Sequence, residues 1–191
     1  KKMTKNWLTK IVSLQVAFAL LGSSAALADQ QFRWESFNSQ SVDTTVGDVP
    51  AGAFKAGENG PIESVSDDSL YLCRGEYQNG VHPGKLWKSW CHIGWNGQEV
   101  LLEEFEVMIT SPGNMTLNWV PSSRGARHPG NTLPGGYNDT SQGFGGYPLR
   151  VCQAEYQGGM HPGKLWLDMC HISWGGQEFP MTDYNLLTVN Q

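Results

Sequence analysis

Lysine, glutamate, histidine and tryptophan residues recur at fixed spacing in two stretches of the sequence. Residues 70–99 and 149–178 align at an offset of 79 without a gap, and 19 of the 30 aligned residues are identical. Carboxylates, a lysine ammonium and amides bind vicinal hydroxyl groups through charge-assisted hydrogen bonds, and an indole face covers the apolar side of a sugar ring. The repeat therefore indicates a small binding site for a polyhydroxylated ligand, present twice. Its shared polar and aromatic residues in the first copy are Glu76, Tyr77, Gln78, His82, Lys85, Trp87, His92, Trp95, Gln98 and Glu99.

The same residues also have structural and catalytic interpretations. Glu76 and Glu99 are hard to bury unpaired, so an internal ion pair with Lys85 or Arg74 accounts for them without a ligand. Two carboxylates can also hydrolyse a glycosidic bond. However, the chain has no G-x-S-x-G, H-E-x-x-H or phosphate-cradling motif, and two copies in one short chain leave little room for a deep cleft. We therefore expect a non-enzymatic binder with no catalytic residues and no cofactor, whose weak single sites gain from their duplication.

Residues 1–28 are predicted to be a secretory signal peptide. Four lysines precede an apolar run from Ile11 to Leu21, and Ala26-Leu27-Ala28 supplies the small residues of a cleavage site. The run is shorter than the roughly 20 residues that span a bilayer, which disfavours a membrane anchor. Removing 28 residues leaves 163, with 9 of the 13 basic and all 18 acidic residues, so the net charge becomes −9. We expect a secreted or periplasmic protein that binds no nucleic acid and does not insert into membranes.

The four cysteines lie in the repeated stretches, and each pair is 18 residues apart. In an exported protein an even, symmetric count predicts local disulfides, Cys73 to Cys91 and Cys152 to Cys170. A zinc site is the rival interpretation. It is disfavoured because Cys91 and the adjacent His92 would point to opposite faces of a strand, and because no Cys-x-x-Cys spacing occurs. We therefore predict no metal site.

The elements that must position these residues read as strands and tight turns. Residues 70–77 have β-prone side chains and little helical periodicity. Asn79-Gly80 then predicts a two-residue hairpin turn. His82-Pro83-Gly84 predicts a second turn, from which Lys85 emerges.

Turn signals continue along the whole chain, as in all-β proteins. Residues 100–110 fit a short helix or a strand, and the recurring turns favour the strand. Trp34 and Trp119 each begin a similar series: a strand, a glycine-rich loop, the repeated hairpins and a closing strand. We predict an all-β fold of antiparallel strands in which two tandem repeats, residues 29–111 and 112–191, pack about a pseudo-twofold axis and share one core.

The repeated motifs resemble those of the DM9 repeat. Both copies carry E-Y-x-x-G-x-H-P-G-K and a later Gly-Gln-Glu, and P-x-G-A-F-x-A-G or P-G-G-Y-N lies upstream. The resemblance covers nearly all of the chain after residue 28. It implies a tandem DM9, lectin-like protein. Characterised members recognise mannose and mannose-rich glycans and can dimerise, so mannose-type glycans and a second copy of the chain are the partners it implies.

In the mannose-binding members, the lysine of the HPGK segment and an acidic residue from a glycine-rich loop hold the ligand. The lysine corresponds to Lys85 and Lys164. The loop partner stays open, and we expect each site to lie where the HPGK segment of one repeat meets the loop of the other. The candidate ligand-binding residues are Lys85, Lys164, Glu58 or Asn59 in AGENGP, Asn138 or Asp139 in GGYNDTS, and the repeated Glu76 and Glu155.

A second class of function fits the same residues. It is a non-enzymatic envelope or protein-interaction module with no sugar ligand, in which the charged residues form only an internal ion-pair network. A small hydrolase is the third and least favoured interpretation.

Overall fold

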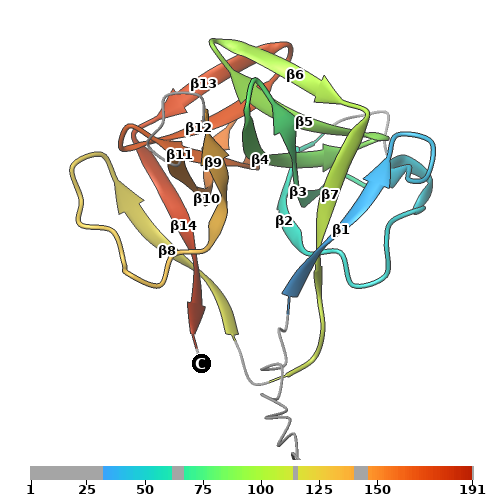
Figure 1. The fold of residues 1–191 in the computed structure, drawn as a ribbon, viewed down its shortest axis with the longest axis horizontal. Coiled ribbons are helices and arrows are strands. Elements are labelled where there is room, and N and C mark those ends of the chain that lie inside the picture. The colour runs from blue at the N-terminus through green and yellow to red at the C-terminus, as the bar shows by residue number, and fades with distance from the viewer. Residues whose placement is uncertain (1–31, 62–66, 114–115, 140–145, 191) are drawn as a thin grey trace, which may run out of the picture.

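The computed structural model describes residues 32–61, 67–113, 116–139 and 146–190 (Figure 1). The predicted signal peptide, residues 1–28, lies outside the described residues. The described chain forms fourteen strands and one short 3₁₀ helix, η1 (Thr44–Val46). The predicted all-β fold is confirmed.

The strands of the first copy recur in the second in the same order. The first copy contributes β1 (Phe32–Asn38), β2 (Lys55–Glu58), β3 (Ser69–Tyr77), β4 (Gly80–Trp87), β5 (Trp90–Trp95), β6 (Gln98–Leu102) and β7 (Glu104–Thr110). The second contributes β8 (Thr116–Ser123), β9 (Pro134–Asn138), β10 (Tyr147–Tyr156), β11 (Gly159–Trp166), β12 (Met169–Trp174), β13 (Gln177–Met181) and β14 (Asp183–Asn190). Residues 100–110 are therefore strand, as favoured above.

The HPGK segment lies inside β4 and β11, so the predicted turn at His82-Pro83-Gly84 is wrong. β4 pairs with β9 at Val81 and with β5 from Lys85 onward. Pro83 falls between these two ladders, where a residue without an N–H is tolerated. Gly84 serves a close approach rather than a turn, because a Cβ there would lie 2.1 Å from the carbonyl oxygen of His92.

The hairpin turn between β3 and β4 lies one residue earlier than predicted. Tyr77 pairs with Gly80, and the two central residues are Gln78 and Asn79, with φ of 47° and 60°. Both residues adopt the left-handed conformation that a two-residue turn requires.

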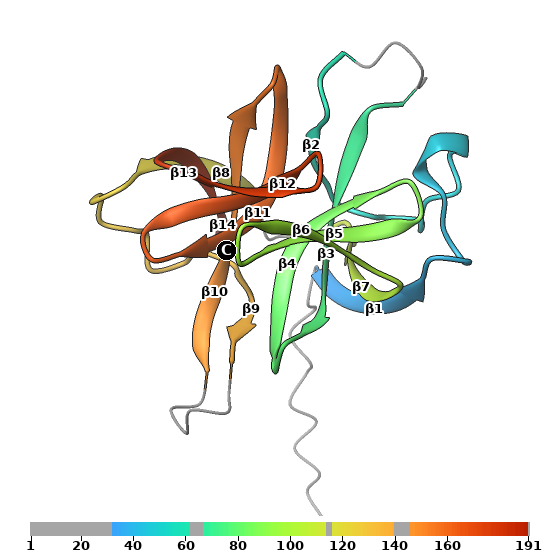
Figure 2. The same ribbon diagram turned by 90° about the horizontal axis from the view of Figure 1, so that it is seen from above.

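The sheet is symmetric about its centre. Its strand order is β1-β7-β3-β2-β11-β12-β13-β6-β5-β4-β9-β10-β14-β8, and exchanging the two copies reverses this order onto itself. The copies meet at the β13–β6 pair, and seen from above β12 and β13 lie beside β5 and β6 (Figure 2). Each copy also pairs a strand of its HPGK hairpin with the glycine-rich strand of the other, as β11 with β2 and β4 with β9. The pseudo-twofold arrangement is confirmed.

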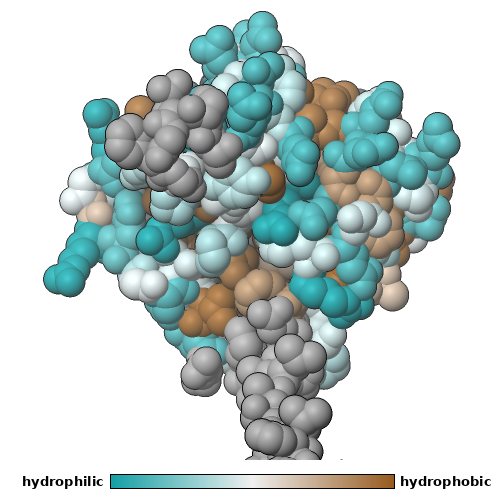
Figure 3. All heavy atoms as spheres, in the orientation of Figure 1, coloured by the Kyte–Doolittle hydropathy of each residue, from teal (hydrophilic) through white to brown (hydrophobic). Residues whose placement is uncertain are grey.

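Apolar packing is divided into two private cores and one shared core. The shared cluster consists of Ala56, Leu72, Met108, Leu133, Val151 and Leu187, three from each copy. Most of the face in Figure 3 is hydrophilic, with apolar residues gathered in a few places. The shared cluster explains why two small units fold as one body, since neither has to bury this surface alone.

Both predicted disulfides are present. Cys73 pairs with Cys91 and Cys152 with Cys170, with Cα atoms 5.9 Å apart in each. All four cysteines are fully buried and belong to the two private cores. Each bridge joins the first hairpin strand to the third, which fixes the strands on either side of the HPGK segment.

Candidate functional site

The two HPGK lysines are buried ion-pair partners, and each reaches across to the other copy. Lys85 and Lys164 are only 2% and 4% exposed. Lys85 Nζ lies 3.5 Å from Glu99 Oε1 and donates to the Ser173 carbonyl of the second copy at 2.5 Å. Lys164 Nζ lies 3.3 Å from Glu178 Oε1 and donates to the Gly94 carbonyl of the first.

The two glutamates close this network across the pseudo-twofold axis. Glu99 Oε2 accepts a hydrogen bond from the Gly176 N–H at 2.8 Å, and Glu178 Oε2 accepts one from the Gly97 N–H at 2.9 Å. The backbone N–H groups of the same glutamates donate to the carbonyls of Gly176 and Gly97, each at 3.1 Å. Each Gly-Gln-Glu turn is therefore held by the turn of the other repeat.

A histidine from the neighbouring strand completes each set. His92 Nδ1 donates to Glu99 Oε1 at 3.0 Å, and His171 Nδ1 lies 3.2 Å from Glu178 Oε1. In the register of β4 and β5, Lys85 pairs with His92, and in β11 and β12 Lys164 pairs with His171. Cross-strand pairing thus places both side chains on one carboxylate.

Burial and charge act in opposite directions on these groups. Burial opposes ionisation of Glu99, but the hydrogen bond from His92 and the charge of Lys85 outweigh it and lower its pKa to about 2. Glu178 is lowered to a pKa of about 2 in the same way, by His171 and Lys164. Burial lowers the pKa of Lys85 to about 8, against the attraction of Glu99, and burial also lowers the pKa of Lys164. The glutamates are therefore carboxylates at neutral pH.

A pocket of about 530 Å³ opens at Lys164. Residues of both copies line it, because Trp95 and Asn96 come from the β5–β6 turn of the first copy and the rest from the second. The Lys164 ammonium lies 5.2 Å from the centre of the Trp95 ring. The lining residues are Trp95, Asn96, Asn138, Leu149, Lys164, Trp166, His171 and Glu178.

Several buried polar atoms around the two lysines have no hydrogen-bond partner among the described residues. At the Lys164 site these include Asn138 Oδ1 and His171 Nε2. In the first copy, Asn59 Nδ2 and His92 Nε2 also lack a partner among the described residues, so the atom left unpaired in the loop amide is the nitrogen there and the oxygen in the second copy. A buried polar atom without a partner costs about 1–3 kcal/mol, so such atoms are rare unless a ligand or water satisfies them.

Comparisons with known proteins concern the family and the fold of the chain. The DM9 repeat family model matches residues 63–144 and 143–191. The chain belongs to the DM9 repeat family. The crystal structure of the nematode sperm cell motility protein MFP2B has a similar fold, with a TM-score of 0.59 at 15% identity, over 83% of this chain and 46% of that one. This chain thus spans about half the length of MFP2B, and the likeness concerns the fold alone. A search of curated proteins gave no match.

The DM9 structure separates the alternatives for the loop partner. Asn59 and Asn138 occupy equivalent positions of the two repeats, Asn59 is 5% exposed, and Asn138 lines the Lys164 pocket. Glu58 is exposed and lies 3.8 Å from Lys55. Among the described residues, Asn138 rather than Asp139 borders the pocket. Asn138 is therefore the loop candidate that borders the Lys164 pocket.

The pocket is shared between the repeats, but its lining does not pair the HPGK segment of one repeat with the loop of the other as expected. Asn138 and Lys164 belong to the same repeat, whereas the other repeat supplies the turn that carries Trp95 and Asn96. The glycine-rich strand does cross to the HPGK strand of the other copy, as the pairing of Met160 with Glu58 shows, yet this contact forms the sheet and not the pocket.

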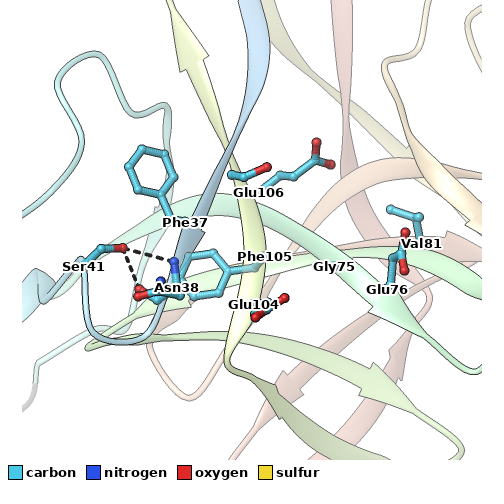
Figure 4. Close-up of a pocket in the computed structure, with 10 residues that line it drawn as sticks. Phe37, Asn38, Ser41, Gly75, Glu76, Val81, Glu104, Phe105 and Glu106 are labelled. Carbon is cyan, nitrogen blue, oxygen red and sulfur yellow. Dashed lines mark hydrogen bonds between the residues drawn. The ribbon is translucent and has the colours of Figure 1, made fainter.

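The repeated Glu76 and Glu155 are both exposed. Glu76 lines a separate hollow of about 760 Å³, where it lies near Val81 with Glu104 and Glu106 in the same wall (Figure 4). The internal ion pair considered for Lys85 is made by Glu99, and Arg74 pairs instead with Glu106 at 2.6 Å. The structure does not bring Glu76 to the lysine.

Glu99 and Trp95 stand among the repeated polar and aromatic residues, but the candidate ligand-binding residues include neither them nor Glu178. The signal for the glutamates was present, because Gly-Gln-Glu recurs in both copies. The role of Trp95 depends on a contact between repeats that no local pattern reveals. Its ring packs edge-on against His82 at 4.8 Å, and His82 Nε2 donates to the Tyr77 carbonyl at 3.0 Å.

Two features are absent from the described part of the chain, a membrane-spanning helix and a metal-binding cluster. No helix there is long and apolar enough to cross a membrane. No group of three or more potential ligand side chains there could hold a metal ion.

Proposed function

We propose that this DM9 protein is a non-enzymatic, lectin-like carbohydrate-binding protein with two quasi-equivalent sites at Lys85 and Lys164. The observation that carries the proposal is the pocket at Lys164, where buried polar atoms that have no partner among the described residues lie beside the tryptophan of the other repeat. Such a mixture of a few fixed polar groups and an aromatic wall is the usual composition of a sugar site.

Each group has a distinct role toward a sugar ring. Lys164 donates to hydroxyl oxygens, while Asn138 Oδ1, the Glu178 carboxylate and His171 Nε2, in the tautomer whose Nδ1–H faces Glu178, accept from hydroxyl hydrogens. A donor and an acceptor side by side suit a vicinal diol. Trp95 offers its ring to the apolar face of the sugar.

The sugar class is taken to be mannose-type, as the family resemblance implies. Where mannose-binding members have an acidic loop residue, this chain presents Asn59 and Asn138, whose amide oxygens still accept from a hydroxyl group. The chain is further proposed to be exported, because residues 1–28 have the pattern of a signal peptide and because its two disulfides would persist in an oxidising compartment.

The rival function is an interaction module without a sugar ligand. The observation that favours it is the burial of both lysines, whose ammonium groups already contact a carboxylate and a carbonyl. In that case the network would serve only to hold the repeats together. A binding experiment decides between the two functions.

The test is a glycan array probed with wild type and with the Asn59→Ala, Asn138→Ala double variant. Alanine at the lysines would be a poor choice, because it leaves a buried carboxylate uncompensated and strongly destabilises the protein. We expect wild type to bind mannose-type glycans and the double variant to lose about tenfold or more in affinity, the equivalent of one or two hydrogen bonds.

The matched control is the Glu76→Gln, Glu155→Gln double variant, which changes repeated but exposed residues away from the pocket. It should bind as wild type does. If wild type binds no glycan, the lectin proposal is wrong and the interaction module takes its place. Release of reducing sugar from a mannan would show instead that the site is catalytic.

A further inference from the structure

The two lysine sites share their buried lysine, glutamate and histidine, but the exposed residues around them, here called the rim, differ in chemistry. The position beside the loop amide is Tyr147 in the second copy and Asp68 in the first. The residue that follows Trp166 in the second copy is Leu167, and the residue that follows its counterpart Trp87 in the first is Lys88. Tyr147 and Leu167 are 56% and 61% exposed.

Tyr147 is a neighbour of residues that line the Lys164 pocket. It pairs across β9 and β10 with Asn138, which lines the pocket, and Leu149, two residues along the same face of β10, is a lining residue too. The Tyr147 ring stands edge-on to the Trp166 ring, with centres 5.0 Å apart and an interplanar angle of 89°. Two aromatic rings therefore meet in an L shape at the pocket mouth.

The Lys85 site carries charges at the same places. The Lys88 ammonium lies over the Trp87 ring, 4.5 Å from its centre, so a cation occupies the ring face. Asp68 takes the Tyr147 position, and its carbonyl accepts from the Asn59 N–H at 2.9 Å. The two copies thus have identical residues around the lysine and different residues at the rim.

We infer that the Lys164 site extends into a second ring-binding subsite, built by Tyr147 and Trp166, that takes the apolar face of the next sugar residue of a glycan. The inference rests on the proposed carbohydrate function and deepens it. An exposed tyrosine fixed by a neighbouring indole presents a flat apolar surface beside a polar pocket, which is what a second pyranose ring requires. The two sites would then have equal affinity for a monosaccharide and unequal affinity for a longer glycan.

The experiment is calorimetric titration of the full chain with methyl mannoside, a mannobiose and p-nitrophenyl mannoside. The last ligand puts an aryl ring where the second sugar would lie, so it separates ring stacking from hydroxyl recognition. We expect the mannobiose to bind one site per chain about five- to tenfold more tightly than methyl mannoside, the gain that one aromatic contact supplies. The second site should show no such gain.

Two surface variants locate the gain. Tyr147→Ala should remove it and leave methyl mannoside binding unchanged, while the matched Asp68→Ala should keep it. Asp68→Tyr should raise mannobiose affinity at the first site. Thermal melting checks that each variant is folded.

Three results would overturn the inference. They are a gain that survives Tyr147→Ala, an equal gain at both sites, or a loss of methyl mannoside binding in folded Tyr147→Ala. If wild type binds methyl mannoside and its affinity for mannobiose is no higher, the proposed function stands and the subsite is refuted. Wild type that binds none of the three ligands removes both.

Discussion

Buried lysine is the central residue-scale fact of this protein. Lys85 and Lys164 enter the interior because each meets a carboxylate and a backbone carbonyl there. An ammonium and a carboxylate lose hydration on burial, and only close pairing with further hydrogen bonds offsets that loss. The Gly176 and Gly97 N–H groups supply those hydrogen bonds to Glu99 and Glu178.

The pairing predicts a strong asymmetry between single and double substitutions. Lys85→Met leaves the Glu99 carboxylate buried beside no cation and should lower the free energy of unfolding by about 3–5 kcal/mol. Lys85→Met with Glu99→Gln removes both charges and keeps an acceptor for the Gly176 N–H, so it should recover most of that loss. Urea unfolding measures both values.

The control for this cycle is the exposed ion pair of Arg33 and Glu35, in which Arg33 Nη2 lies 2.5 Å from Glu35 Oε1. Arg33→Met should cost no more than about 1 kcal/mol. A Lys85→Met, Glu99→Gln variant as unstable as the single variant would contradict the account of the network.

At the scale of elements, the hairpins were predictable and the path of HPGK was not. Alternating β-prone residues and Asn-Gly pairs identify strands and two-residue turns from local sequence. Pro83 and Gly84 look like a turn by the same local rules. The need for glycine at position 84 comes from the close approach of β4 to the His92 carbonyl on β5, a contact that only the folded sheet creates.

The loop partner of the lysine was partly within reach of the sequence. The offset of 79 aligns Asn59 with Asn138 and Glu58 with Tyr137, so the repeat itself favoured the amides. The contribution of Trp95 to the site of the other repeat lay beyond reach, because it depends on how β6 and β13 meet.

One histidine in each repeat, His82 in β4 and His161 in β11, should make stability depend on pH. His82 and His161 are fully buried, and their Nε2 atoms donate to the carbonyls of Tyr77 and Tyr156 across each turn. Burial, with the charge of the lysine of the other repeat, lowers the pKa of each from 6.5 to about 4. The unfolded chain therefore binds more protons than the folded one between pH 6.5 and 4, so stability falls as pH falls through this window.

Acid titration of unfolding measures the effect. From pH 7 to pH 5 the free energy of unfolding should drop by about 2 kcal/mol per histidine. Glu99 and Glu178, with a pKa of about 2 against 4.5 unfolded, add their loss only below pH 4.5. The His82→Gln, His161→Gln variant should be nearly flat between pH 7 and 5, and an equal drop in that variant would show that other groups cause it.

At the scale of the whole molecule, the two repeats form one structure rather than two linked ones. The strand order reads the same from both ends, strands of each copy pair with strands of the other, and a third core contains residues of both. The Lys164 site consequently depends on the whole chain, since its lysine comes from one repeat and Trp95 and Asn96 come from the other. Lys85 likewise reaches the Ser173 carbonyl of the second repeat.

Nuclear magnetic resonance of the tryptophan side chains during titration with methyl mannoside tests this central claim most directly. Trp95 and Trp166 report on the Lys164 site, and their counterparts Trp174 and Trp87 report on the Lys85 site. All four indole signals should shift in wild type, whereas in Asn138→Ala only those of Trp87 and Trp174 should shift. If Trp95 still shifts in Asn138→Ala and instead loses its response in Asn59→Ala, or if no indole responds in wild type, the account of two composite sugar sites is wrong.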